Sequence, residues 1–211
     1  MSIIRGAVIA IYAAALVLVI GNGAEAASLP TAATKAAISA PLRWPIADAA
    51  ARVTKKTFGL YVTPKSSPVQ PDRFTGYHTG VDFETTVAEQ KQDVVINVAC
   101  DGTLLVKRWA SGYGGAVVQS CKIGNQQVTV IYGHLQLASV TAKVGTKLKA
   151  GARLGILGRG FSTETDRERK HLHFAIHRGA GVSLLGYVQK RSALSTWLDP
   201  LTYLAKSAPV L

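Results

Sequence analysis

The chain has 211 residues, of which 48% are hydrophobic, and a formal net charge of +12. This length allows one substantial domain and is too short for two of ordinary size. The hydrophobic content excludes an intrinsically disordered chain.

Residues 1–26 have the pattern of a secretory signal peptide. Arg5 supplies a positive start, residues 6–20 form an unbroken apolar run, and Ala24-Glu25-Ala26 offers small residues for cleavage. The apolar run is shorter than the ~20 residues that span a bilayer. We therefore favour cleavage, with a retained anchor extended through residues 21–27 as the alternative. Either outcome predicts an exported protein in the periplasm, at the cell surface or outside the cell.

The segment after the signal peptide, residues 27–43, is expected to be a linker, because it is rich in Ala, Ser and Thr and has no hydrophobic period. The folded domain is expected over residues 44–211. Residues 62–77 carry three prolines among polar side chains, which predicts a long surface loop. Helix is expected only near residues 46–52 and 196–206.

Short β-rich segments with glycine between them fill the middle of the chain. They are VVINVAC (94–100), GTLLVKRW (102–109), GAVVQSC (115–121), QVTVIYGHL (127–135), a pair near TKLKAGARLGILG (146–158) and HLHFAIH (171–177). No helical period of useful length appears between residues 82 and 178. This pattern predicts an all-β domain, built as an antiparallel sheet or sandwich with short peripheral helices.

The chain contains two cysteines, Cys100 and Cys121, and each ends an apolar, strand-like run. Antiparallel neighbouring strands could bring the two within bridging range. A disulfide is favoured over metal ligation, because neither cysteine has a partner at close ligand spacing and an exported chain meets oxidising conditions.

Four of the five histidines fall in three short motifs: YHTGVDF at 77–83, YGHL at 132–135 and HLHF at 171–174. In HLHFAIH a strand period of two places His171, His173 and His177 on one face. The other face is apolar and is expected to pack on the core. The histidine face is then directed to solvent or to a metal.

His78 and Asp82 are four residues apart, but Gly76 and Gly80 indicate a turn entering a strand instead of a helix. Zinc accepts imidazole nitrogen and carboxylate oxygen at about 2.0–2.2 Å, and three protein ligands leave a fourth position for water. Two histidines and one carboxylate meet that requirement. An H-x-H pair alone is a common accident, so the joint occurrence of the motifs in an exported, β-rich chain is what favours a hydrolytic metal site.

The three motifs, in this order, resemble those of the lysostaphin-like (LytM-type) zinc endopeptidases. The resemblance runs from about Trp44 to Leu204 and includes the DGTLLV strand, the VGTKLKAGARLGILG hairpin and the closing DPLTYL. It implies an antiparallel β-sheet domain of the duplicated hybrid motif type, with a groove bounded by loops. It also implies one catalytic zinc ion and a substrate in the peptide portion of peptidoglycan. The residues that the resemblance assigns are zinc ligands His78, Asp82 and His173, and catalytic residues His134 and His171.

Two departures from that pattern concern loop shape and substrate preference. The charged stretch STETDRERK stands where relatives have a Gly-rich turn before H-x-H, and Ala175 stands where Glu is common. The loops at 159–170 and 179–196 flank the HLHF strand and are candidate walls of a binding groove. His177 matches no family role, and we interpret it as a rim or structural residue.

Three functions are compatible with these features. The first is an active zinc endopeptidase, and the second is a non-catalytic wall-binding regulator of other peptidoglycan hydrolases. A minor third is a carrier-type β domain, because the strand-turn-strand run at 144–157 places Lys149 in its turn.

The expected partners follow from export and from the basic charge. They are peptidoglycan peptides and, by long-range attraction, anionic wall polymers or a membrane surface, and they do not include nucleic acid. Removal of residues 1–26 takes away one charge of each sign, so the exported chain keeps the formal charge of +12. We expect a monomer.

Overall fold

A computed structural model describes residues 42–204. The predicted signal peptide and almost all of the predicted linker lie outside the described residues. Within residues 42–204 no helix is long and apolar enough to cross a membrane.

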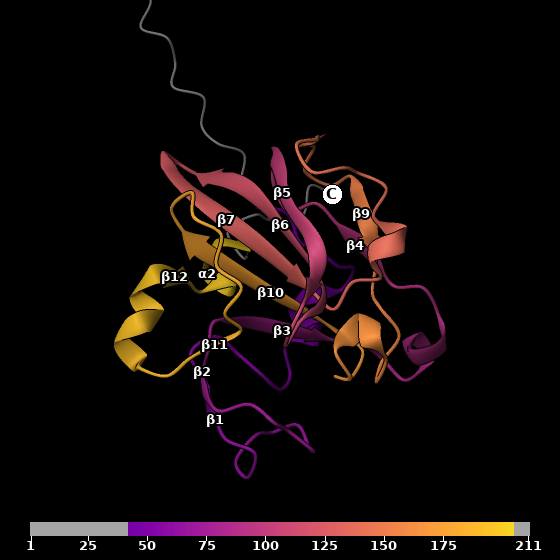
Figure 1. The fold of residues 1–211 in the computed structure, drawn as a ribbon, viewed down its shortest axis with the longest axis vertical. Coiled ribbons are helices and arrows are strands. Elements are labelled where there is room, and N and C mark those ends of the chain that lie inside the picture. The colour runs from indigo at the N-terminus through magenta and orange to yellow at the C-terminus, as the bar shows by residue number, and fades with distance from the viewer. Residues whose placement is uncertain (1–41, 205–211) are drawn as a thin grey trace, which may run out of the picture. The chain divides into compact units, whose positions relative to one another are not determined.

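The described residues form short helices and twelve strands, most of them antiparallel partners of one another (Figure 1). The strands are β1 (Tyr61–Val62), β2 (Gly76–His78), β3 (Gly80–Glu84), β4 (Val95–Asn97), β5 (Gly102–Ala110), β6 (Gly114–Ile123), β7 (Gln126–Gly133), β8 (Lys147–Leu148), β9 (Arg153–Ile156), β10 (His171–Arg178), β11 (Tyr187–Val188) and β12 (Trp197–Leu198). The α-helices are α1 (Ala49–Arg52) and α2 (Pro200–Leu204), and the 3-10 helices are η1 (Ala88–Lys91), η2 (Leu137–Ser139), η3 (Thr163–Thr165) and η4 (Arg191–Thr196).

The largest sheet has the strand order β12-β10-β7-β6-β5-β8, and β3 also pairs with β10. In Figure 1 the long strands β5, β6, β7 and β10 lie side by side. Along one edge of β10, β3 pairs with its first half and β12 with its last residues. Every pairing in the sheet is antiparallel. The predicted all-β, antiparallel fold is therefore confirmed.

Two smaller sheets complete the described chain, with strand orders β1-β2-β11 and β4-β9. They show that the hairpin predicted at 146–158 is wrong, because β8 pairs with β5 whereas β9 pairs with β4. The two strands on either side of this turn, β8 and β9, therefore belong to different sheets. Alternating apolar residues predicted the strands correctly, but alternation says nothing about which distant strand each will pair with.

The core lies on the apolar face of β10, as its alternation predicts. Leu172, Phe174 and Ile176 are fully buried there, and Phe174 packs with Phe83 of β3 and Tyr132 of β7. The opposite face carries the histidines, of which His171 and His173 are also buried. Their burial requires polar partners on that face.

A disulfide joins Cys100 and Cys121, whose Cα atoms are 6.0 Å apart. The expected route to this pairing is wrong, because Cys100 does not lie in a strand that neighbours β6. It lies in the connection from β4 to β5, and the pairing of β5 with β6 brings it to Cys121.

The two α-helices lie where helix was predicted, and the segment between β1 and β2 is the predicted proline-containing loop. The four 3-10 helices were not predicted. They have three to six residues each, which is too short for a hydrophobic period to show.

Candidate metal centre

The ligand candidates are brought together by strand pairing. His78 ends β2 and Asp82 lies in β3, with only the bend at Thr79 between the two strands, so no helix joins the two residues. β3 runs antiparallel to β10, and in that register Asp82 lies directly opposite His173. Gly80 allows this close approach, because a Cβ atom there would press on the Phe174 carbonyl oxygen and on the His173 ring.

Three side-chain atoms converge at this point. Nε2 of His78 lies 3.0 Å from Nδ1 of His173, and each of these nitrogens lies 3.2 Å from Oδ1 of Asp82. All three residues are buried. The structure thus places the three sequence-predicted ligand candidates in one cluster.

The donor chemistry of this cluster fits a metal ion. Nδ1 of His78 lies 3.2 Å from the carbonyl oxygen of Thr57, which can only accept, so Nδ1 carries the proton and Nε2 presents a lone pair. A lone pair, a second imidazole nitrogen and a carboxylate oxygen about 3 Å apart repel one another unless a cation lies among them. Two nitrogens and one oxygen are donors that zinc accepts, and the distances permit bonds of about 2.0–2.2 Å to all three.

The protonation states also suit metal binding, which requires neutral imidazole and ionised carboxylate. Burial lowers the pKa of His173 to about 4, although the neighbouring Asp82 opposes this change. Burial alone would raise the pKa of Asp82, but the neighbouring His171 and His78 hold it well below its usual value. At neutral pH His173 and Asp82 therefore offer their donor atoms free of protons.

Arg169 binds the outer oxygen of the Asp82 carboxylate. Its Nη2 donates to Oδ2 of Asp82 at 2.8 Å, while Nε and Nη2 also donate to Glu84. This leaves Oδ1 of Asp82 directed at the two histidines. Sequence reasoning missed this role, because Arg169 was read only as part of the charged loop at 159–170.

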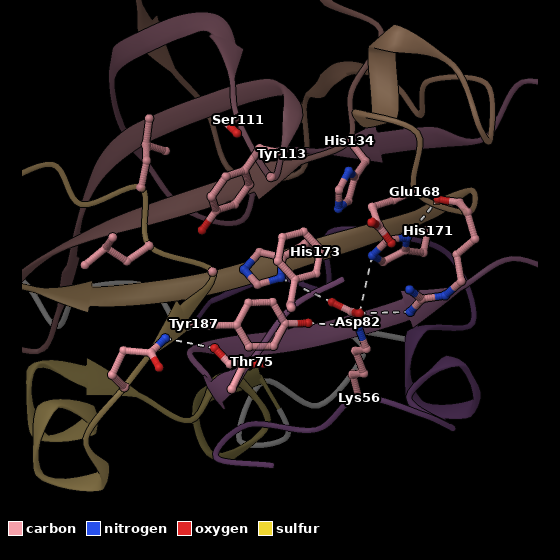
Figure 2. A pocket seen from close by; sticks show the side chains of 17 residues that line it. Lys56, Thr75, Asp82, Ser111, Tyr113, His134, Glu168, His171, His173 and Tyr187 are labelled. Carbon is pink, nitrogen blue, oxygen red and sulfur yellow. Dashed lines mark hydrogen bonds and ion pairs between the residues drawn. The ribbon is translucent and has the colours of Figure 1, made fainter. Parts of the chain in front are cut away.

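His134 and His171 lie beside the cluster, with ring centroids 4.3 Å apart (Figure 2). Nδ1 of His134 donates to the carbonyl oxygen of Thr165 at 3.2 Å, and Nδ1 of His171 donates to that of Arg169 at 2.9 Å. In His134 Nε2 is therefore left as the basic atom, whereas Nε2 of His171 lies 3.3 Å from Oδ2 of Asp82. Burial, followed by the nearby His171 and His173, lowers the pKa of His134 well below its usual value.

A cavity of about 220 Å³ lies over these residues and contains Asp82, His134, His171 and His173 in its lining. One wall comes from Glu168 and Arg169, and the opposite wall comes from residues 184–187. These segments belong to the two loops that the sequence predicted as groove walls.

Other lining residues carry no motif and were not predicted. Tyr187 stacks on Phe74 with ring centroids 5.0 Å apart, and its hydroxyl accepts a hydrogen bond of 2.8 Å from the buried Lys56. Tyr113 comes from the connection between β5 and β6. By contrast His177 does not line the cavity, and its ring packs on Trp197 at 4.8 Å.

Comparison with known proteins gives one family and a set of similar folds. The model of peptidase family M23 matches residues 76–184, which is more than half of the chain. A structure of LytU is 22% identical, with a TM-score of 0.50, over 74% of this chain and 86% of that chain. CbpA from L. salivarius REN is 18% identical, with a TM-score of 0.52, over 79% and 96% of the two chains.

A chain of the SpoIIIAH and SpoIIQ complex is also 18% identical, with a TM-score of 0.52, over 77% of this chain and 99% of that chain. At these identities the likeness shows a shared fold. No curated protein matches the chain.

Proposed function

The chain belongs to peptidase family M23, and from that premise we propose that it is a zinc endopeptidase that hydrolyses peptide cross-links or stem peptides of bacterial peptidoglycan. The observation that carries the proposal is a buried His-Asp-His cluster, two of whose members, Asp82 and His173, line one cavity with two further histidines. A structural zinc site has four protein ligands, whereas three ligands leave a position for water. The cluster has three.

His78, Asp82 and His173 are the residues that would hold the metal. A bound zinc ion supplies a water molecule of lowered pKa and polarises the scissile carbonyl group. Two of these ligands are already oriented for metal binding. The Thr57 carbonyl holds Nδ1 of His78, and Arg169 holds the outer oxygen of Asp82. Such outer contacts orient metal ligands.

His134 and His171 would move the protons. Each ring has its Nδ1 proton committed to a backbone carbonyl, and Nε2 of His171 also lies 3.3 Å from Oδ2 of Asp82, so Nε2 of His134 is the atom that can take a proton from the attacking water. As the carbon–nitrogen bond breaks, the same imidazole can return that proton to the leaving amine. The lowered pKa of His134 keeps this base neutral at the pH of the reaction.

Zinc content and wall hydrolysis test the proposal together. We expect pure protein to contain one zinc ion and to release soluble muropeptides from purified sacculi. His78→Ala should lose both properties, whereas His177→Ala, altered on the same face of β10 but outside the cavity, should keep both. A protein without stoichiometric zinc, or a His78→Ala variant as active as its parent, would overturn the proposal. Mass spectrometry of the released muropeptides would then identify the bond.

A non-catalytic role is the second candidate, and the likeness to a chain of the SpoIIIAH and SpoIIQ complex favours it, because that structure is a protein assembly. The two candidates differ in the need for His134 and His171. Replacement of either histidine without loss of folding should abolish the cellular function of an endopeptidase. An unaffected phenotype would favour the regulator.

We also propose that residues 1–26 direct export and that residues 44–211 form the peptidase domain. The proposed export rests on the apolar run and cleavage pattern of the N-terminus. Sequencing the N-terminus of protein recovered from outside the cytoplasm tests it. A mature start near Ala27 is expected, and an intact Met1 would instead support the retained anchor.

A further inference from the structure

Tyr113 presents a buried hydroxyl group that has no partner. Within residues 42–204, three buried side-chain polar atoms lack a hydrogen bond: the hydroxyl of Tyr113, Nε2 of His173 and Oδ2 of Asp72. The last of these is only 2.7 Å from the ammonium group of Lys56, so an ion pair satisfies it. The other two belong to residues that line the metal-centre cavity. Buried polar groups without partners are rare and call for a specific reason.

The fold fixes Tyr113 beside the site. The residue is 2% exposed and lies between β5 and β6, and its ring packs across Gly133, where a Cβ atom would come 2.7 Å from Cδ1 of the tyrosine. The ring also meets that of His173 edge-on, with centroids 5.1 Å apart and planes at 88°. Its backbone carbonyl accepts a hydrogen bond of 2.9 Å from the amide of His134. Tyr113 thus contacts one ligand candidate and one candidate base.

The hydroxyl faces the cavity on the side of residues 184–187 (Figure 2). Gly186 borders it, and a Cβ atom there would come 3.7 Å from the oxygen, an ordinary van der Waals contact, so a residue without a side chain leaves room beside the hydroxyl. The other cavity tyrosine differs in this respect, because the hydroxyl of Tyr187 already accepts a hydrogen bond from Lys56.

We propose that Tyr113 is a further catalytic residue, whose hydroxyl donates a hydrogen bond to the carbonyl oxygen of the scissile peptide as that oxygen becomes negatively charged. This inference rests on the proposed peptidase function. A phenol keeps its proton at neutral pH and is a donor in a site otherwise rich in acceptors. A fixed donor directed at developing charge is among the strongest sources of catalysis.

The step balances without transfer of the tyrosine proton. When the water oxygen bonds to the carbonyl carbon, the π electron pair moves onto the carbonyl oxygen, and Tyr113 shares its proton with that oxygen. The proton from the water goes to a histidine. When the pair returns and the carbon–nitrogen bond breaks, the amine nitrogen takes that proton from the histidine.

Tyr113→Phe tests the inference through three measurements on the zinc-loaded exported chain: muropeptide release at saturating sacculi, zinc content and melting temperature. We expect kcat to fall about 10²- to 10³-fold, the loss measured for single donors of this kind. Zinc content should not change. The melting temperature should stay the same or rise, because the deleted hydroxyl has no partner to lose.

Tyr132→Phe is the matched control. The hydroxyl of Tyr132 is buried in the core, donates to Gln119 and accepts from the amide of Ala99. Its removal leaves both partners without this hydrogen bond. We therefore expect the opposite result, a lower melting temperature with unchanged kcat.

Unchanged kcat in Tyr113→Phe would overturn the inference while leaving the peptidase function standing. Loss of activity together with lost zinc or a lower melting temperature would also overturn it, because Tyr113 would then be structural. If the parent chain neither binds zinc nor releases muropeptides, the peptidase function fails, and the inference fails with it.

Discussion

The two histidines of the HLHF motif line the same cavity but differ in what their Nδ1 atoms contact. His171 donates its Nδ1 proton to the carbonyl of Arg169, whereas Nδ1 of His173 points at Asp82 and at Nε2 of His78. Side chains two positions apart on a strand share a face, so the sequence places both rings together. The hydrogen bond made by Nδ1 then separates the base from the ligand.

Replacing either base should remove chemistry and leave the metal. We expect His134→Ala and His171→Ala each to lower kcat by about 10²- to 10⁴-fold, the range for general acid–base groups, with zinc content unchanged. Metal analysis and muropeptide release measure the two quantities. His177→Ala is the control and should match the parent. Loss of zinc from either variant would contradict the assigned division of roles.

Arg169 should affect the metal without touching it. Because its guanidinium holds the outer oxygen of Asp82, we expect Arg169→Gln to weaken zinc binding about 10- to 100-fold, as loss of such outer contacts does. Competition with a chelator of known affinity measures the change. Arg73→Gln breaks ion pairs with Asp166 and Glu168 in the same loop and should leave zinc affinity unchanged. Equal affinities in all three proteins would show that Arg169 has no such role.

At the residue scale, sequence motifs found the five clustered positions but not the residues that orient them. Histidine and aspartate at family spacing are visible in a sequence. Tyr113 and Arg169 carry no motif, and their contacts depend on a register that no local pattern encodes: His173 lies opposite Gly133, and the missing side chain makes room for the Tyr113 ring.

At the element scale, the strands were predictable because alternation and glycine turns are local properties. The pairing of these strands was less predictable. β8 and β9 were expected to pair with each other, yet each joins a strand more than forty residues earlier in the chain, as the pairs Gly102 with Leu148 and Val95 with Ile156 show. Long-range pairing is decided by packing of the whole domain, which a run of thirteen residues does not contain.

The disulfide should stabilise the sheet without affecting the site. It joins residues 21 apart in the sequence, for which loop-closure entropy predicts about 3 kcal/mol. Cys121 lies near the end of β6, whereas Tyr113 immediately precedes its start. The Cys100→Ser/Cys121→Ser variant should therefore lose about 3 kcal/mol of unfolding free energy in denaturant titration. Its kcat should equal that of the parent below the melting temperature, and a reduced kcat would contradict the separation of bridge and site.

At the scale of the whole molecule, the net charge of +12 should govern attachment to the wall. Attraction between exposed charges is screened over about 10 Å at 0.1 M salt and about 3 Å at 1 M. We expect binding of the His78→Ala protein to purified anionic walls to weaken as salt rises between these concentrations. Cosedimentation measures bound protein, and walls stripped of anionic polymer are the control. Binding that does not change with salt would refute electrostatic retention.

The ligand candidates are carried by a backbone ladder, because β10 is hydrogen-bonded to β3 on one side and to β7 on the other. The pairing itself involves main-chain atoms, whereas the metal-ligand candidates are side chains. Scaffold and chemistry can therefore be inherited separately: a lineage could lose the histidines by a few substitutions and still pass on the same sheet and the same groove. In such a descendant, natural selection would act on the ligand that the groove binds. The groove would keep the shape of a peptidase site without the hydrolytic activity.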